Sequence, residues 1–206
     1  MKKTFLKMIF VIDESGSMAG SESDVTGGFN AYVEKQRSEN PGKVQVSLYK
    51  FSDTVSRVVS NKPISKIARL TEEDYVPGGF TALYDAIGAA IREADLEVSR
   101  MDEDGRPDRV MMVIITDGQE NASKEFSSAS IHALIATHES MLNWSFVFLG
   151  SGLTDLTDAE SIGVKHRVSS SKVNLKSNFD RVAENSVMFC CHLPASMDDL
   201  VEELRE

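Results

Sequence analysis

Apolar residues in this chain form either short unbroken runs or runs with helical spacing. The unbroken runs at residues 8–12, 110–115 and 146–149 predict strands that are buried on both faces. Between residues 83 and 94 the apolar positions recur every three or four residues, which predicts an amphipathic helix. Similar but weaker patterns predict helices that begin near residue 25 and near residue 127. Strands therefore alternate with helices, which is typical of a mostly parallel sheet covered by helices on both faces.

Residues 44–51 and 54–59 depart from this alternation. Only a short polar turn at Ser52 and Asp53 separates the two segments, so they predict a hairpin that adds one antiparallel edge strand. Residues 63–70 predict a short helix or an irregular crossover. Further along, we expect a short helix at 154–163, an edge strand at 164–168 and two C-terminal helices within 175–206, the second marked by Met197, Leu200, Val201 and Leu204. The prediction is one doubly wound α/β domain over residues 1–206, with a core at about 5–170.

Composition narrows the class of protein. The 206 residues are 41% hydrophobic and 26% charged, ordinary values for one soluble globular domain. A formal net charge of −10 disfavours nucleic acid and anionic lipid as partners, because both repel an acidic surface. No apolar run is long enough to span a bilayer. The adjacent Cys190 and Cys191 suggest buried free thiols, and with no recognisable signal peptide at the start we expect a cytoplasmic location.

Oxygen-bearing side chains occur in three segments that the predicted fold brings to one rim. Asp13, Ser15 and Ser17 follow the first strand, Thr81 follows a glycine turn before a helix, and Asp117 follows a central strand. Ligand sites in such folds lie at the carboxyl ends of the strands. Two carboxylates and three hydroxyls, without sulfur or imidazole, suit a hard cation such as Mg²⁺, with Mn²⁺ or Ca²⁺ as alternatives. Thr81 also stands where it could cap the following helix.

The pattern Asp-x-Ser-x-Ser, then a distant Thr, then a distant Asp resembles the metal-ion-dependent adhesion site of von Willebrand factor A domains. The flanking sequences VIDESGSM, GGFTALYDAI and IITDGQEN are also similar to that family. The resemblance implies that Ser15, Ser17 and Thr81 bind the metal directly and that Asp13 and Asp117 act through water. It further implies that a Glu or Asp of a partner protein completes the metal's coordination, and for intracellular relatives the partner is often an AAA+ ATPase.

Two alternatives to a metal-dependent binding module remain. Asp13 follows the first strand, as the nucleophile of some Mg²⁺-dependent phosphoryl-transfer enzymes does, but Ser15 stands where the second acid of the dehalogenase-like phosphatases is needed. His138 shares the apolar face of its predicted helix, so we interpret it as a core residue and expect no catalytic residues. The other alternative is a scaffold whose metal site is vestigial.

Overall fold

The structure is a computed structural model, which describes residues 4–40, 42–150, 155–169 and 175–191. Its centre is a six-stranded sheet in the order β3-β2-β1-β4-β5-β6. The strands are β1 (Phe5–Asp13), β2 (Lys43–Phe51), β3 (Val55–Pro63), β4 (Arg109–Thr116), β5 (Trp144–Gly150) and β6 (His166–Ser169). All neighbours are parallel except β2 and β3, which pair antiparallel at one edge. The predicted fold class and its antiparallel edge strand are therefore confirmed.

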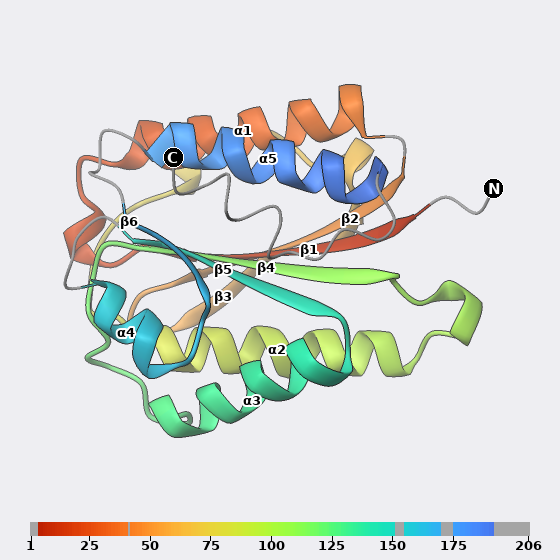
Figure 1. Cartoon of the computed structure of the whole chain (residues 1–206). Coiled ribbons are helices and arrows are strands. Elements are labelled where there is room, and N and C mark those ends of the chain that lie inside the picture. The colour runs from red at the N-terminus through yellow and green to blue at the C-terminus, as the bar shows by residue number, and fades with distance from the viewer. Residues whose placement is uncertain (1–3, 41, 151–154, 170–174, 192–206) are drawn as a thin grey trace.

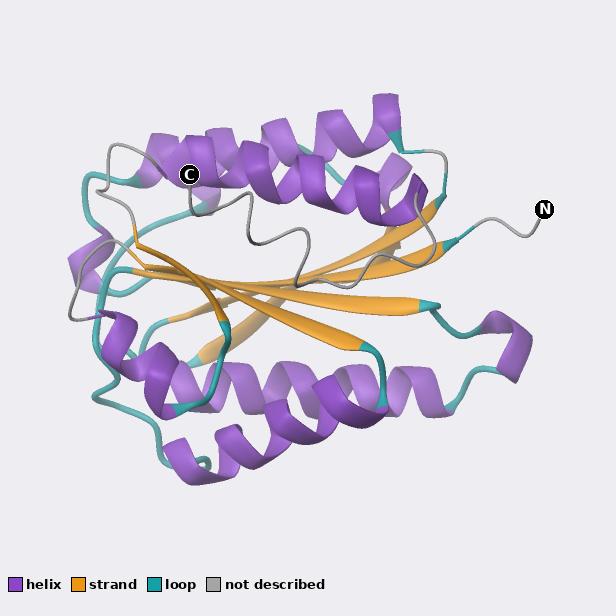
Figure 2. Cartoon of the chain, in the orientation of Figure 1, coloured by secondary structure: helices purple, strands orange, loops and turns teal. Residues whose placement is uncertain are grey.

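Helices cover both faces of this sheet (Figures 1 and 2). One face carries α1 (Glu22–Glu39) and α5 (Leu175–Cys191), and the other carries α2 (Leu83–Ser99), α3 (Ser128–Met141) and α4 (Asp155–Ser161). The second C-terminal helix predicted from Met197 to Leu204 lies outside the described residues. The crossover predicted over residues 63–70 contains one short 3₁₀ turn, η2 (Ile64–Lys66), and a second, η3 (Glu72–Asp74), follows it. Two more 3₁₀ turns are η1 (Gly16–Met18) and η4 (Glu103–Gly105).

The sheet separates two hydrophobic cores. On the α1–α5 face, the Phe10 ring lies 5.3 Å from Phe29 and 4.9 Å from Tyr32, measured between centroids. On the α2–α3 face, Trp144 lies 4.6 Å from His138. Every residue of β1, β4 and β5 is buried, as expected for strands between two helical layers. His138 is itself 3% exposed and bonded to the Leu134 carbonyl and to Asp95, which confirms that it belongs to the core.

Lys7 is a buried charged residue within this sheet. β1 begins at Phe5, so Lys7 lies inside the strand and is fully buried. Its ammonium donates to Asn61 Oδ1 at 2.7 Å and to Glu97 Oε2 at 2.5 Å. These partners replace the water that burial removes, and they explain how a lysine is tolerated in a central strand.

The strand register decides where the polar loops gather. Ile12 of β1 is opposite Ile115 of β4, and Asp13 is opposite Phe51 of β2. The parallel strands β1, β2 and β4 therefore end level with one another. Their carboxyl ends place the loops after β1 and β4 at one rim of the sheet, on the left in Figure 1.

Candidate metal centre

Asp13 is the last residue of β1 and the most deeply placed of the five predicted site residues. Its side chain is fully buried. One carboxylate oxygen accepts a hydrogen bond of 2.7 Å from the Ser15 amide, and the other accepts one of 2.5 Å from the Thr116 hydroxyl. Both oxygens are thus held in fixed directions by the turn that follows β1 and by the end of β4.

Burial raises the pKa of Asp13, and the nearby Asp117 adds to that rise. The hydrogen bonds from Thr116 and Ser15 favour the charged form, but they do not fully offset the cost of desolvation. A positive charge beside this carboxylate would favour its ionised form. Among the described residues, no cationic side chain offsets the buried carboxylate of Asp13 at this rim.

The remaining residues of the first loop connect Asp13 to Asp117. The hydroxyl oxygens of Ser15 and Ser17 lie 3.1 Å apart, and Ser17 donates a 2.6 Å hydrogen bond to Asp117 Oδ1. Ser15 is 1% exposed, whereas Ser17 is exposed and Asp117 is half-buried. The oxygens thus form a series that runs from the protein interior toward solvent.

Thr81 does not cap the helix that follows it, contrary to one sequence-based expectation. Helix α2 begins at Leu83, and its N-cap residue, Ala82, makes no side-chain cap hydrogen bond. The Thr81 amide instead donates to Asn121 Oδ1 at 2.9 Å, and the Asn121 amide donates to the Thr81 carbonyl at 3.0 Å. This pair of bonds fixes Thr81 against the loop after β4.

Gly118 shows where the site oxygens converge. A Cβ atom placed on this glycine would lie 3.0 Å from Thr81 Oγ1, 3.1 Å from Ser17 Oγ and 3.5 Å from Asp13 Oδ2. Three oxygens, two from the loop after β1 and one from Thr81, thus face one small space beside Gly118, which the absence of a side chain at this glycine leaves open. The sequence alone did not connect this glycine with the site.

The donor set fits a hard cation. All five side chains offer oxygen, and Mg²⁺ prefers oxygen ligands in a compact arrangement. Within the described residues, no group of three or more His, Cys, Asp or Glu side chains is placed to hold a metal ion. A site on this rim therefore depends on hydroxyl ligands, and a softer metal that requires imidazole or thiolate finds none.

Residues behind the five site residues hold these loops in place. Asp85 accepts hydrogen bonds from the amides of Lys124, Glu125 and Phe126. Glu120 and Asn121 hold the same loops: Asn121 accepts a hydrogen bond from the Thr81 amide, and Glu120 accepts hydrogen bonds from the amides of residues 84, 122 and 123. Gln119 and Asn121 are exposed, and Glu120 is half-buried.

Comparison with known proteins agrees with this architecture. The sequence model of the von Willebrand factor type A domain matches residues 8–183, and no curated protein matches the chain. Among solved structures, the chain is similar to proximal thread matrix protein 1 (PTMP1) from the mussel byssus, with 19% identity, a TM-score of 0.61, and coverage of 89% of this chain and 46% of that one. It thus spans less than half of the mussel protein.

Two bacterial pilus proteins are similar as well. The PilB minor pilin from Streptococcus sanguinis has a TM-score of 0.68 at 13% identity, covering 95% of this chain and 64% of that one. The von Willebrand factor domain of the type V pili tip protein Mfa5 from Porphyromonas gingivalis has a TM-score of 0.65 at 11% identity, covering 95% and 99%. At these identities the likeness concerns the fold. In the described ranges, no helix is long and apolar enough to cross a membrane.

Proposed function

Because the chain belongs to the von Willebrand factor type A family, whose domains often mediate protein–protein interaction, we propose that it is a metal-dependent binding module. In this proposal Asp13, Ser15, Ser17, Thr81 and Asp117 hold Mg²⁺, or Mn²⁺ or Ca²⁺ in its place, and the ion captures a Glu or Asp of a partner protein. The observation that carries the proposal is the convergence of oxygens from the loop after β1 and from Thr81 on the space beside Gly118, which follows Asp117 in the chain.

The five proposed site residues differ in charge. Asp13 and Asp117 supply two negative charges, while Ser15, Ser17 and Thr81 offer neutral hydroxyls. A divalent ion bound to such a set retains positive charge and attracts an outside carboxylate. Ser17 and Asp117 lie at the solvent side of the series, so a partner reaches the site from that side.

A nucleophilic role for Asp13 receives no support from the geometry. The carboxylate is fully buried, and both of its oxygens accept hydrogen bonds within the protein. A nucleophile needs an oxygen that can approach the reacting atom. We therefore retain the proposal of a non-enzymatic role and of a partner protein that offers an acidic side chain. The sequence resemblance implies an AAA+ ATPase as the class of that partner.

The metal part of the proposal is tested by thermal unfolding with Mg²⁺ or with EDTA. Binding to the folded state alone stabilises it by about 2.7 kcal/mol at a hundredfold excess of ligand over Kd, so Mg²⁺ should raise the Tm of the wild-type protein. Thr81→Ala should abolish that rise. Thr137→Ala is the control, because Thr137 is an exposed threonine of α3 whose hydroxyl donates to the Ala133 carbonyl, and it should keep the rise. An equal response of both variants would contradict the assignment.

Carboxylate capture is tested with a displayed library of seven-residue peptides that carry a fixed central Glu. Selection in Mg²⁺ should yield binders that lose affinity in EDTA and when the central Glu is replaced by Gln. Binders that are indifferent to both changes would overturn the proposed function.

A further inference from the structure

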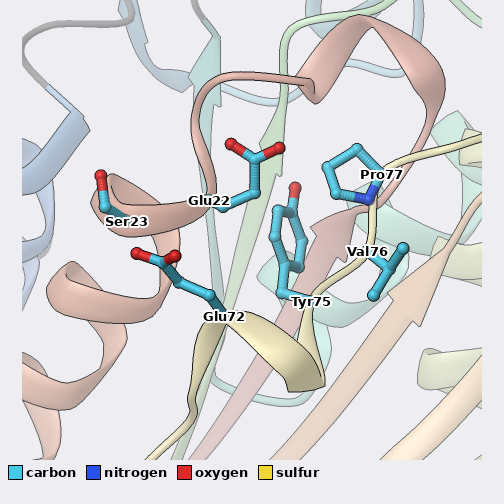
Figure 3. Close-up of a pocket in the computed structure, with 6 residues that line it drawn as sticks. All are labelled: Glu22, Ser23, Glu72, Tyr75, Val76 and Pro77. Carbon is cyan, nitrogen blue, oxygen red and sulfur yellow. The ribbon is translucent and has the colours of Figure 1, made fainter.

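The loop after β1 is supported from the side of α1 and η3. A pocket of about 520 Å³ opens there, and Figure 3 shows the residues that line it: Glu22, Ser23, Glu72, Tyr75, Val76 and Pro77. Tyr75 in the pocket wall is 1% exposed, and its hydroxyl donates a hydrogen bond to the backbone carbonyl of Asp13. This side of the rim therefore fixes the first of the proposed ligand segments.

Thr81 and Asp117 are supported by α4, which lies on the opposite face of the sheet from α1 (Figure 1). Tyr84 stands three residues after Thr81, and Glu120 stands three residues after Asp117. Both contact the carboxylate of Asp158 in α4. The Glu120 amide donates to Asp158 Oδ2 at 2.9 Å, and the Tyr84 hydroxyl donates to Asp158 Oδ1 at 3.2 Å. One side chain thus joins the two chain segments that follow two of the proposed ligands.

Glu120 and Tyr84 are also bonded to each other. The Tyr84 amide donates to Glu120 Oε2 at 3.0 Å, and the other carboxylate oxygen of Glu120 accepts from the amides of Ala122 and Ser123 at 2.9 and 2.7 Å. Hydrogen bonds therefore connect Tyr84, Glu120 and Asp158 pairwise. These three residues belong to α2, to the loop after β4 and to α4, so the three elements are held at a fixed spacing beside the site.

Helix α4 has support that does not depend on the metal centre. Ala159, the residue after Asp158, is fully buried in the core on the α2–α3 face. From α3, the Ser128 hydroxyl donates to the Ser161 hydroxyl at 3.0 Å and to the Ser161 carbonyl at 3.1 Å. Asp158 is therefore held in place by packing, and the segments of Thr81 and Asp117 are held relative to it.

The spacing of the ligands matters for the proposed ion. Mg²⁺ demands a near-ideal octahedral arrangement of oxygens at short distances, so a shift of Thr81 relative to Asp117 weakens binding. Residues that orient metal ligands from behind typically change metal affinity by about 10-fold to 100-fold when they are replaced.

We propose that Asp158 is a positioning residue of the metal centre: it sets the spacing between Thr81 and Asp117, and the placement of α4 therefore controls the affinity for the ion. This inference rests on the proposed function and adds a means of regulation to it. Coupling between two sites is reciprocal, so ion binding also strengthens the contact between α4 and the loop after β4.

The test compares Mg²⁺ affinities of three variants by isothermal titration. Asp158→Ala removes both acceptor oxygens together with one negative charge. Glu160→Ala is the matched control, because it removes one charge from an exposed residue of the same helix, whose side chain pairs with Arg167 at 3.1 Å. Tyr84→Phe removes the hydroxyl that contacts Asp158 without a change of charge.

Asp158→Ala should bind Mg²⁺ about tenfold more weakly than the wild-type protein, and Glu160→Ala should stay within about twofold of it. Tyr84→Phe should weaken binding about threefold, as expected for one hydrogen bond to a partly exposed carboxylate. The double variant Tyr84→Phe/Asp158→Ala should bind no more weakly than Asp158→Ala alone, because both changes break the same contact.

Hydrogen exchange of the metal-free protein gives a readout that does not involve the ion. In EDTA, the Glu120 amide should exchange faster in Asp158→Ala than in the wild-type protein or in Glu160→Ala, because it has lost its carboxylate acceptor. In Mg²⁺, exchange at the same amide should slow in the wild-type protein and much less in Asp158→Ala. Two-dimensional NMR measures these rates, and melting curves in EDTA check that all variants are folded.

The outcomes that contradict the two proposals differ. Equal Mg²⁺ affinities of Asp158→Ala and Glu160→Ala, or a loss in Tyr84→Phe that adds fully to that of Asp158→Ala, would overturn the positioning role and leave the proposed function standing. A wild-type protein that does not bind Mg²⁺ would overturn the proposed function and this inference with it.

Discussion

Gly118 lies at the point where oxygens of Thr81, Ser17 and Asp13 approach one another. A methyl group there would occupy the space that the proposed ion requires. We therefore expect Gly118→Ala to fold and to lose the Mg²⁺-induced rise in Tm, with at least a tenfold weaker apparent affinity, about 1.4 kcal/mol. Isothermal titration with Mg²⁺ measures this loss.

The control for Gly118 is in the neighbouring loop. A Cβ atom on Gly78 would meet no atom within 4 Å, so Gly78→Ala should bind Mg²⁺ as the wild-type protein does. Undiminished Mg²⁺ affinity in Gly118→Ala would show that the ion does not occupy the space beside this glycine.

Glu97 is the residue whose ionisation should be visible in the pH dependence of stability. Burial opposes its charged form, but hydrogen bonds from Lys7 and Arg57 outweigh that cost and hold its pKa below the ordinary value of 4.5. A carboxylate with a lowered folded-state pKa stabilises the protein above its unfolded pKa, and that stabilisation is lost as pH falls through the folded pKa. Wild-type protein should therefore lose stability as pH falls below about 4.5.

Glu97→Gln should cost about 3 kcal/mol at pH 7, because it leaves the buried Lys7 without its anionic partner. The difference in unfolding free energy between wild type and variant should shrink as pH falls through the window below 4.5. Urea unfolding at pH 7 and at pH 3.5 measures it, and Glu103→Gln in the exposed η4 turn is the control. A difference that stays constant with pH would contradict the assigned role of this ion pair.

Helices α1 and α5 pack closely because α1 carries glycine at their contact. A Cβ atom on Gly28 would lie 2.2 Å from the Phe179 ring, whereas one on Gly27 would meet nothing within 4 Å. Gln36 Nε2 also donates to the Ala183 carbonyl at 2.8 Å. The close approach of the two helices thus depends on Gly28 and not on the adjacent Gly27.

Two adjacent substitutions should therefore have opposite effects. Gly28→Ala should lower the free energy of unfolding by about 1–3 kcal/mol, because it overpacks the contact with Phe179. Gly27→Ala should raise it by about 0.5–1 kcal/mol, because alanine loses less backbone entropy than glycine in a helix. Urea unfolding of both variants measures the difference, and a stabilising Gly28→Ala would show that α5 does not pack on α1 as described.

At the scale of the molecule, a net charge of −10 should attract a divalent cation. Salt screens such attraction, since the Debye length falls from about 10 Å at 0.1 M to about 3 Å at 1 M. We expect the Kd for Mg²⁺ to rise about threefold to tenfold between 0.05 and 0.5 M tetramethylammonium chloride. Isothermal titration at the two salt concentrations checks this.

The positions of the negative charges should affect Mg²⁺ affinity as well as their total number. Glu22→Gln/Glu72→Gln removes two charges beside the candidate site, and Glu103→Gln/Asp104→Asn removes two in η4, which precedes the amino end of β4 at the opposite rim. At low salt the first variant should weaken Mg²⁺ binding more than the second, and the gap should narrow at high salt. Equal effects at low salt would indicate that the net charge of the whole protein, rather than the charges near the site, determines the affinity for Mg²⁺.

The sequence by itself determined the class of fold and the five candidate site residues. Unbroken apolar runs marked the central strands because those strands are buried on both faces, and the Asp-x-Ser-x-Ser loop, Thr81 and Asp117 could be found because a chain order of strand, loop and helix brings strand ends to one rim. These features depend on local pattern and on the topology that such patterns favour.

Only the tertiary structure decided how those residues are surrounded. The burial of Lys7, the use of Asn121 to hold Thr81 and the close approach of site oxygens to Gly118 all involve segments far apart in the chain. The same is true of the pocket between α1 and η3. A polar residue in a sequence has no partner until the fold supplies one, so its role as ligand, support or pocket wall is a property of three-dimensional contacts and not of spacing.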